Sequence, residues 1–142
     1  MNALSRLTLQ VLAAAVITGN AAADELYSVY SKDVGWTAID LVISEVSWNG
    51  RVSQLRIPRY ESRSAIESRF AMCAFTDIAI QRGFEVWVVS DGSITDEVVQ
   101  VGFLRTGDED AGTILGKQFV GDRALRAEVR AINRMCGIQP RK

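Results

Sequence analysis

The sequence predicts an α+β domain: an antiparallel sheet with two helices on one face, in the element order β-β-α-β-β-α. Apolar and polar residues alternate within residues 37–57, which also contain an Asn-Gly turn signal. Two later segments carry apolar residues at helical spacing, and a glycine directly follows each of them. A sheet with both helices on one face is the simplest way to bury these apolar surfaces together.

The first 23 residues have the three parts of a secretory signal peptide. Arg6 precedes an apolar run over residues 7–17, and three alanines end at Ala23. A membrane-spanning helix needs about 20 apolar residues, so a cleaved signal is favoured over a retained anchor. We therefore expect export to the periplasm, or secretion, and a single mature domain over residues 24–142.

The composition excludes several classes of chemistry. The chain has 16 Lys and Arg residues, 17 Asp and Glu residues, and no histidine. Without histidine there is no Ser-His-Asp or Cys-His nucleophile and no His-ligated zinc, and two cysteines are too few for a Cys-only zinc site. The near-neutral charge gives no electrostatic reason to bind nucleic acid. We expect no cofactor and no metal, and an enzyme here would have to use carboxylates, Lys, Tyr or an outside cofactor.

The mature chain is expected to begin with an N-terminal arm and a hairpin. Residues 24–35 show no clear period, which predicts an arm with room for one short element near residues 27–30. Residues 37–57 alternate as paired strands do, and Asn49-Gly50 marks the turn between them.

The hairpin loop is expected to contain three residues, Trp48-Asn49-Gly50. This loop places Ile43 opposite Leu55, and so keeps the apolar side chains of both strands on one face. A two-residue loop would place polar residues opposite the apolar ones. The preferred loop leaves Trp48 at the hairpin tip and Gly50 in a left-handed position.

A long helix follows the hairpin. The helix begins at Ser62 or Ser64, of which Ser64 fits a capping box with Glu67, and Gly83 ends it after Arg82. The helix is apolar nearly all round, which predicts burial on more than one side. Asp77 also falls on its inward stripe.

Two further strands are expected to form the second half of the sheet. Residues 84–89 form a buried strand, residues 91–93 a turn, and residues 98–104 the next strand. An acidic loop covers residues 106–112, and residues 114–120 are ambiguous between a short strand and a loop.

A last helix is expected over residues 123–136, with Asp122 as its cap and Gly137 as its end. Its inward stripe ends in Cys136. The opposite face carries four arginines: Arg123, Arg126, Arg130 and Arg134. This face could bind phosphate, lipopolysaccharide or an acidic partner, or it could simply be the solvated back of an amphipathic helix.

The two cysteines, Cys73 and Cys136, predict a disulfide bond. Each lies on the inward stripe of its own helix, and an exported chain meets an oxidising environment. The alternative is two separate buried thiols. A redox-active pair is disfavoured because the C-x-x-C spacing is absent.

Two tryptophans are candidates for a partner surface. Trp87 alternates with Val86 and Val88, so it points to the opposite face of the sheet. Together with Trp48 it could form an exposed apolar patch of the kind that marks interfaces. The alternative is that the N-terminal arm covers Trp87.

The carboxylates give weaker evidence for a functional site. Asp108, Glu109 and Asp110 lie in a loop and could suit calcium, but the EF-hand order is absent, so a solvated turn is the simpler interpretation. Acidic residues near the turn at residues 91–97 could support glycoside chemistry, although turns favour such residues anyway. Asp77 is interpreted as a structural hydrogen-bond hub or, alternatively, as a catalyst with a raised pKa.

Residues 68–93, SRFAMCAFTDIAIQRGFEVWVVSDGS, resemble a segment of a family of small exported bacterial envelope proteins, many of them lipoproteins. Ala74, Gly83, Phe84 and Glu85 fall at places comparable with the family's helix–Gly–strand junction, as does Val88. This chain lacks the lipid-bearing cysteine of that family. The resemblance implies an α+β envelope protein, and it brings no assigned activity and no site residues.

The leading functional hypothesis is a non-catalytic periplasmic domain that binds an envelope partner. The alternatives are a small enzyme that uses carboxylates and a carrier of a small ligand. A deep pocket lined by Asp77 or Glu85 would favour the alternatives, whereas a flat sheet face that carries Trp48 and Trp87 would favour the partner-binding domain.

Overall fold

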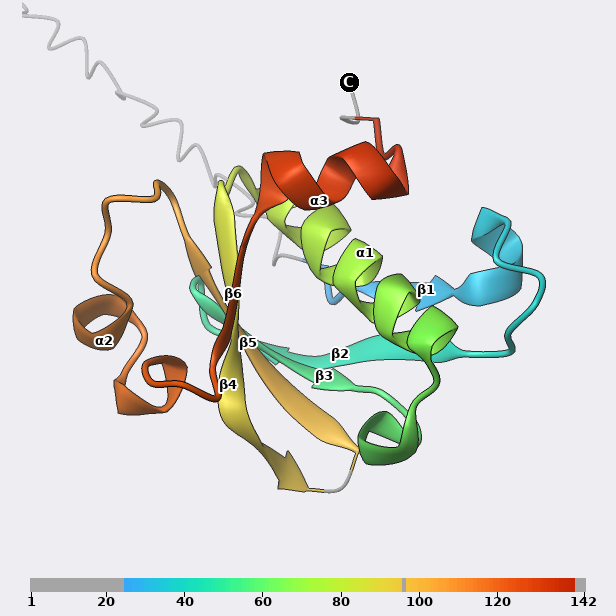
Figure 1. Cartoon of the computed structure of the whole chain (residues 1–142), viewed down its shortest axis with the longest axis horizontal. Coiled ribbons are helices and arrows are strands. Elements are labelled where there is room, and N and C mark those ends of the chain that lie inside the picture. Colours follow the sequence, from blue (N-terminus) through green and yellow to red (C-terminus); the bar gives the residue numbers. More distant parts are fainter. Residues whose placement is uncertain (1–24, 96, 140–142) are drawn as a thin grey trace, which may run out of the picture.

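The computed structural model describes residues 25–95 and 97–139, and the predicted signal peptide lies outside them (Figure 1). In the described part of the chain, one antiparallel sheet holds its strands in the order β1-β2-β3-β5-β4-β6. The strands are β1 (Ser28–Tyr30), β2 (Val42–Trp48), β3 (Val52–Arg56), β4 (Val86–Thr95), β5 (Val98–Leu104) and β6 (Leu125–Glu128). The helices are α1 (Ala65–Arg82), α2 (Ala111–Ile114) and α3 (Val129–Cys136), with the 3-10 turns η1 (Ser31–Val34), η2 (Tyr60–Ser62) and η3 (Lys117–Phe119). The α+β class and the antiparallel sheet are confirmed.

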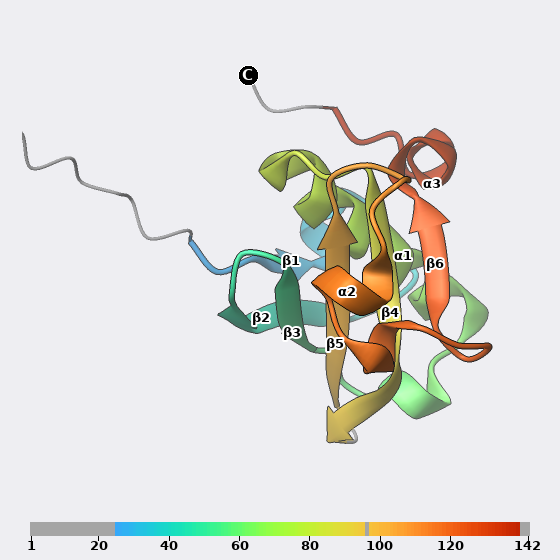
Figure 2. The same ribbon diagram turned by 90° about the vertical axis from the view of Figure 1, so that its left-hand side faces the viewer.

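The helices are divided between the two faces of the sheet, which corrects the prediction of two helices on one face. In Figure 1 and Figure 2, α1 crosses one face while α2 lies against the other, and α3 packs beside α1 beyond the end of β6. Alternation along β4 is the physical reason. Trp87 and Val89 belong to the core under α1. Val86 and Val88 face the other way and pack with Leu115 in a second, smaller core.

The predicted element order differs from the structure at three places. The short element expected near residues 27–30 of the N-terminal arm is present as the edge strand β1, which the predicted order did not count. The end of the expected acidic loop and the ambiguous residues 114–120 contain α2 and η3 rather than a strand.

The first part of the predicted last helix is the edge strand β6, so α3 begins only at Val129 and its N-cap is Glu128 rather than Asp122. Residues 125–128 form a strand because the edge of β4 is free to pair with them. This pairing gives their backbone N–H and C=O groups partners, whereas the first N–H groups of a helix have none within the helix.

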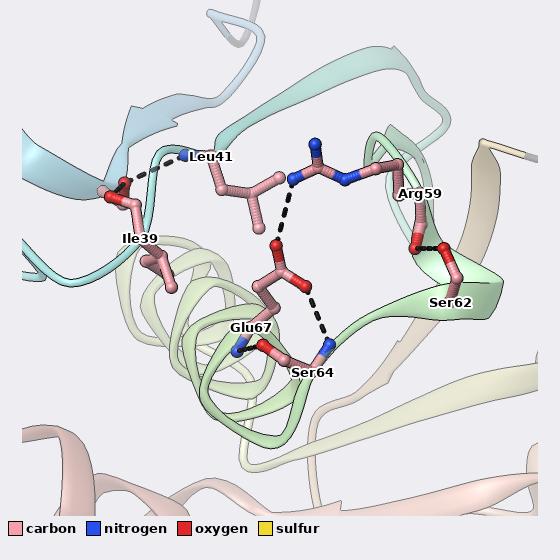
Figure 3. A network of polar contacts seen from close by, with 7 residues as sticks. Ile39, Leu41, Arg59, Ser62, Ser64 and Glu67 are labelled. Atoms are coloured by element: carbon pink, nitrogen blue, oxygen red, sulfur yellow. Dashed lines mark hydrogen bonds and ion pairs between the residues drawn. The ribbon is translucent and has the colours of Figure 1, made fainter.

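Helix α1 has the predicted bounds. Ser64 Oγ accepts the N–H of Glu67 at 3.3 Å, and the Glu67 carboxylate accepts the N–H of Ser64 at 2.8 Å, which completes the capping box (Figure 3). Arg59 adds an ion pair to Glu67 at 3.1 Å. At the other end Gly83 has φ +77°, the left-handed conformation that closes a helix.

The register of the β2–β3 hairpin differs from the prediction. Glu45, not Ile43, lies opposite Leu55, and an irregularity in the pairing follows Glu45. The turn consists of Gly50 and Arg51, with Gly50 at φ +94°, and so lies one to two residues later than the expected loop over residues 48–50. The reason is Asn49, whose side-chain oxygen accepts two backbone N–H groups at 3.0 and 2.7 Å and so closes a tighter turn.

The predicted disulfide between Cys73 and Cys136 is confirmed, with an S–S distance of 2.05 Å and Cα atoms 5.6 Å apart. It joins the middle of α1 to the last residue of α3. Because α3 covers little of the sheet itself, this bond and the contacts with α1 hold the C-terminal helix in place.

Candidate functional site

A groove of about 350 Å³ runs between the edge strand β1 and helix α1. Residues 25–30 form one side, η1 closes one end with Asp33 and Val34, and α1 provides Asp77 and Gln81. Three carboxylates and no Lys or Arg are found among the described residues that line it. The groove therefore combines an open strand edge with one carboxylate on each of its three sides.

Backbone pairing with β2 sets the edge of β1 that faces the groove. The C=O of Tyr27 accepts a hydrogen bond from β2 at 2.7 Å, and the N–H of Ser31 donates to the chain just before β2 at 2.9 Å. Backbone groups alternate in direction along an antiparallel strand. The N–H and C=O of Ser28 and the N–H of Tyr30 therefore point away from β2, along the groove.

Ser31 fixes the end of β1. Its side chain is 0 % exposed, its Oγ accepts the N–H of Leu41 at 3.0 Å, and its hydroxyl donates to the C=O of Ile39 at 3.0 Å. These bonds tie η1 to the non-strand segment just before β2. They hold the groove's end wall in one place.

Asp77 lies on the groove rather than in the core. Its carboxylate accepts the hydroxyl of Tyr27 at 2.9 Å and the side-chain amide of Gln81 at 3.0 Å. The side chain is half-buried, so the prediction of a buried hub is corrected. The reason is that the sheet curls away under this part of α1 and leaves the groove beside Asp77.

The buried hub is Glu45, which the sequence analysis did not single out. Its carboxylate is 0 % exposed and forms two hydrogen bonds with Arg82, at 2.8 and 2.7 Å. It also accepts the N–H of Tyr27 at 2.9 Å and the hydroxyl of Ser53. The sequence contains a signal for this hub. Ile43 and Glu45 are two residues apart on one strand, so their side chains share a face, and Glu45 therefore places a charge on the core face of β2.

Electrostatics keep Glu45 ionised. Burial would raise the pKa of its carboxyl, but hydrogen bonds from Arg82, Ser53 and the Tyr27 N–H, with the Arg82 charge, together lower it. Because Glu45 binds the start of β1 and Arg82 ends α1, this pair sets the spacing of the two walls of the groove.

Trp48 and Trp87 do not form a common surface. Trp87 is 0 % exposed, packs edge-on against Phe75 at 5.3 Å, and donates its indole N–H to Thr76 at 3.0 Å. Helix α1 covers it, so neither the exposed patch nor cover by the N-terminal arm is correct. Trp48 is half-buried beneath the Arg82 guanidinium, which lies 4.0 Å from the ring centroid.

A smaller apolar pocket of about 230 Å³ adjoins the groove. Trp36 and Phe70, with ring centroids 5.6 Å apart, line it together with the disulfide and Ile138. Tyr27, Val29, Val34 and Asp77 line both hollows. The polar groove therefore leads directly into an apolar pocket.

The four predicted surface arginines do not share a helix face. Arg123 precedes β6 and forms an exposed ion pair with Asp91 at 3.0 Å. Arg126 lies in β6 and donates to the C=O of Gly107 at 2.8 Å. Of the four, only Arg130 and Arg134 lie on α3. The strand β6, which replaces the first part of the helix, is the reason for this correction.

The acidic loop is occupied by local contacts. Glu109 forms an ion pair with Arg51 at 3.0 Å and accepts the N–H of Arg105, and hydrogen bonds with those residues lower the pKa of its carboxyl. Asp110 caps α2 by accepting the N–H of Thr113 at 2.8 Å. Among the described residues there is no cluster of three His, Cys, Asp or Glu side chains that could hold a metal ion.

Comparisons with protein-family models, with curated proteins and with solved structures give no match to this chain. In the described part of the chain, no helix is long and apolar enough to cross a membrane. Asp77 lines the groove and Glu85 lines a separate hollow of about 430 Å³, whereas Trp87 is buried, so the tryptophan face expected for a partner-binding domain is absent from the described residues. The strand edge of β1, rather than the tryptophans, is therefore the feature that supports partner binding.

Proposed function

We propose that this chain is an exported, non-catalytic domain that binds an extended, basic segment of a partner protein in the bacterial envelope. The segment would add as a strand to the open edge of β1. The groove between β1 and α1 is the observation that carries this proposal. Backbone N–H and C=O groups of the β1 edge face it, and its charged lining residues are all acidic.

Strand addition uses backbone groups that the fold already presents. Ser28 and Tyr30 direct N–H and C=O groups away from β2, as the alternation of hydrogen bonds requires. Peptides that bind at sheet edges gain affinity from such backbone bonds and specificity from alternate side chains. The groove follows residues 25–30 along the strand edge, with α1 as its second wall, and this elongated lining suits a polypeptide.

The charge of the groove defines the partner's chemistry. Glu25, Asp33 and Asp77 line it, and the charge of the neighbouring Arg82 is already neutralised by Glu45. A segment with Lys or Arg on the side that faces α1 would be favoured, and an acidic segment would be repelled.

The adjoining pocket offers a place for one apolar side chain of the segment. Trp36 and Phe70 present aromatic surface there. Side chains of an added strand alternate between faces, so a segment in which basic and apolar residues share the α1-facing side would use both hollows.

Export agrees with the disulfide. The Cys73–Cys136 bond persists in oxidising compartments such as the periplasm. The signal sequence and the family resemblance point the same way. We therefore place the partner in the envelope.

Binding can be tested with a synthetic octapeptide of sequence KTVTKTVT, which places lysine and valine on the same side of the strand, compared with ETVTETVT, in which glutamate replaces lysine. We expect the lysine peptide to bind and to shift the amide NMR signals of Ser28, Tyr30 and Gln81, and the glutamate peptide to leave them unchanged. Asp33→Asn should weaken binding, whereas Asp108→Asn, an exposed acidic residue of the loop before α2, serves as the matched control.

A proline substitution separates strand addition from simple charge attraction. Ser28→Pro removes an N–H that points away from β2, and edge strands tolerate proline at such positions. We expect this variant to melt near the temperature of the natural chain and to lose peptide binding. Unchanged binding would reject strand addition, and binding of free lysine as tight as that of the peptide would favour a small-ligand carrier.

A further inference from the structure

The second edge of the sheet, β6, is distinct from the groove. It is the outermost strand beyond β4 (Figure 2), and no strand of the described residues pairs with its outer side. The N–H of Val129 donates to the C=O of Glu85 at 2.9 Å, and Ala127 pairs with Trp87. Backbone groups alternate in direction along a strand, so the N–H and C=O groups of Arg126 and Glu128 point to the outer side, away from β4.

The side chains of Arg126 and Glu128 share one face of the sheet. They lie opposite Val88 and Val86, respectively, and both are exposed. The strand therefore carries one exposed cation and one exposed anion two residues apart. Such a strand matches a second copy of itself when the two strands run antiparallel around Ala127.

In that register Arg126 of each copy lies opposite Glu128 of the other. The N–H of each Glu128 faces the C=O of the other copy's Arg126, so the backbone pairs as well. The N–H of each Arg126 faces the C=O of the other copy's Glu128, and a carbonyl oxygen with two lone pairs can accept this bond together with the first bond of α3. Arg126 keeps donors for this contact because a guanidinium carries five N–H groups and Gly107 uses one.

We infer that two copies of this chain form a symmetric dimer by antiparallel pairing of their β6 strands. Charge complementarity selects a second copy as the occupant, because a one-residue slip in register separates both Arg–Glu pairs. On the opposite face Leu125 is 51 % exposed, but Val129, which lies opposite it in the other copy, is only 7 % exposed, so the charge pairs and the backbone bonds carry the contact. The contact is short, so the dimer is reversible and depends on protein concentration.

Charge reversal tests this dimer on the purified exported chain by sedimentation velocity across a concentration series. The natural chain should shift from monomer to dimer as its concentration rises. Arg126→Glu and Glu128→Arg each place two like-charged pairs across the axis, and each should weaken the dimer about tenfold or more. Arg130→Glu, the same charge change just outside the strand on α3, should leave the dimer unchanged.

Mixing the two variants gives the decisive measurement. In a mixed pair, the introduced glutamate of one variant lies opposite the introduced arginine of the other, and the retained Arg126 lies opposite the retained Glu128. The heterodimer should therefore form with an affinity near that of the natural dimer. The double variant R126E/E128R should dimerise with itself for the same reason. Circular dichroism melts check that each variant is folded.

A natural chain that stays monomeric over the whole series would overturn the inference. So would a dimer that the single reversals leave intact, or single reversals that dissociate the dimer without recovery on mixing. Glu128→Arg is informative even if Arg126→Glu loosens the loop at Gly107, because the contact with that loop is made by Arg126.

Discussion

Glu45 and Arg82 show how single residues organise the groove. The pair is almost fully buried, with side-chain exposures of 0 % and 14 %, and it joins the start of β1 to the end of α1. A buried carboxylate is tolerated only when its lone pairs are satisfied, and here Arg82, Ser53 and the Tyr27 N–H satisfy them. Its role is therefore the geometry of the site rather than proton transfer.

Replacement of Arg82 by alanine should destabilise the domain strongly. The change leaves Glu45 buried without its cation, and breaking such a pair costs about 3–5 kcal/mol. Urea unfolding measures this loss. Arg69→Ala, an exposed arginine of the same helix, is the control and should change the free energy of unfolding by less than about 0.5 kcal/mol. An equal decrease in the free energy of unfolding in the two variants would show that the buried pair stabilises the domain no more than an exposed arginine does.

Acid should weaken the fold through the same residue. The pKa of Glu45 is lowered in the folded state, so its ionised form stabilises the domain above the pKa of an unfolded glutamate, about 4.3. This stabilisation is lost as the pH falls through the lower, folded pKa. We expect the natural chain to lose more stability than Glu45→Gln between pH 7 and pH 3, as followed by urea unfolding. Parallel curves for the two proteins would contradict this assignment.

At the scale of elements, α3 depends on the disulfide. The helix has eight residues and only Val129 is buried, which is too little apolar contact to hold it on α1 alone. The bond closes a span of 63 residues in sequence, from Cys73 to Cys136. Its removal should therefore affect α3 first.

Cys136→Ser should lower the free energy of unfolding by about 2–5 kcal/mol, the usual cost of removing a native disulfide from a small domain. Hydrogen exchange should show α3 exchanging faster in this variant, while α1 keeps its protection. Peptide mapping without reductant checks the bond itself. Two thiols that alkylate in the native protein would show that the bond is not formed.

Across the whole molecule, stability should follow the position of each strand in the sheet. The strands β2, β3, β5 and β4 are paired on both sides, and helices or turns cover β4 and β5 on both faces. The strands β1 and β6 are edges, and they are the strands that we propose to pair with other chains.

Hydrogen exchange at low protein concentration should therefore rank the strands. Amides of β5 should exchange slowest, and those of β1 and β6 fastest, because local opening of an edge breaks fewer contacts. At high concentration β6 should gain protection while β1 does not, since only β6 pairs with a second copy. Protection of β1 equal to that of β5 would mean that the edge is closed and unsuited to strand addition.

Local signals in the sequence predicted much of the fold. Ser64, Glu67 and Gly83 bounded α1 correctly because caps are interactions between near neighbours in the chain. The strand over residues 98–104 was correct because its apolar run is short and bounded by polar residues. The pairing of Cys73 with Cys136 followed from the number of cysteines and their helical stripes.

The tertiary structure alone decided the features on which function depends. Residues 125–128 have a helical pattern, yet they form β6 because β4 has an edge to pair with. Trp87 is buried because α1 covers that face of the sheet. The groove exists because β1 pairs with β2 while Glu45 and Arg82 hold α1 beside it. Each of these features joins segments that lie far apart in the chain. The free energy of each contact depends on which surfaces meet, and the residues of one segment alone do not determine this.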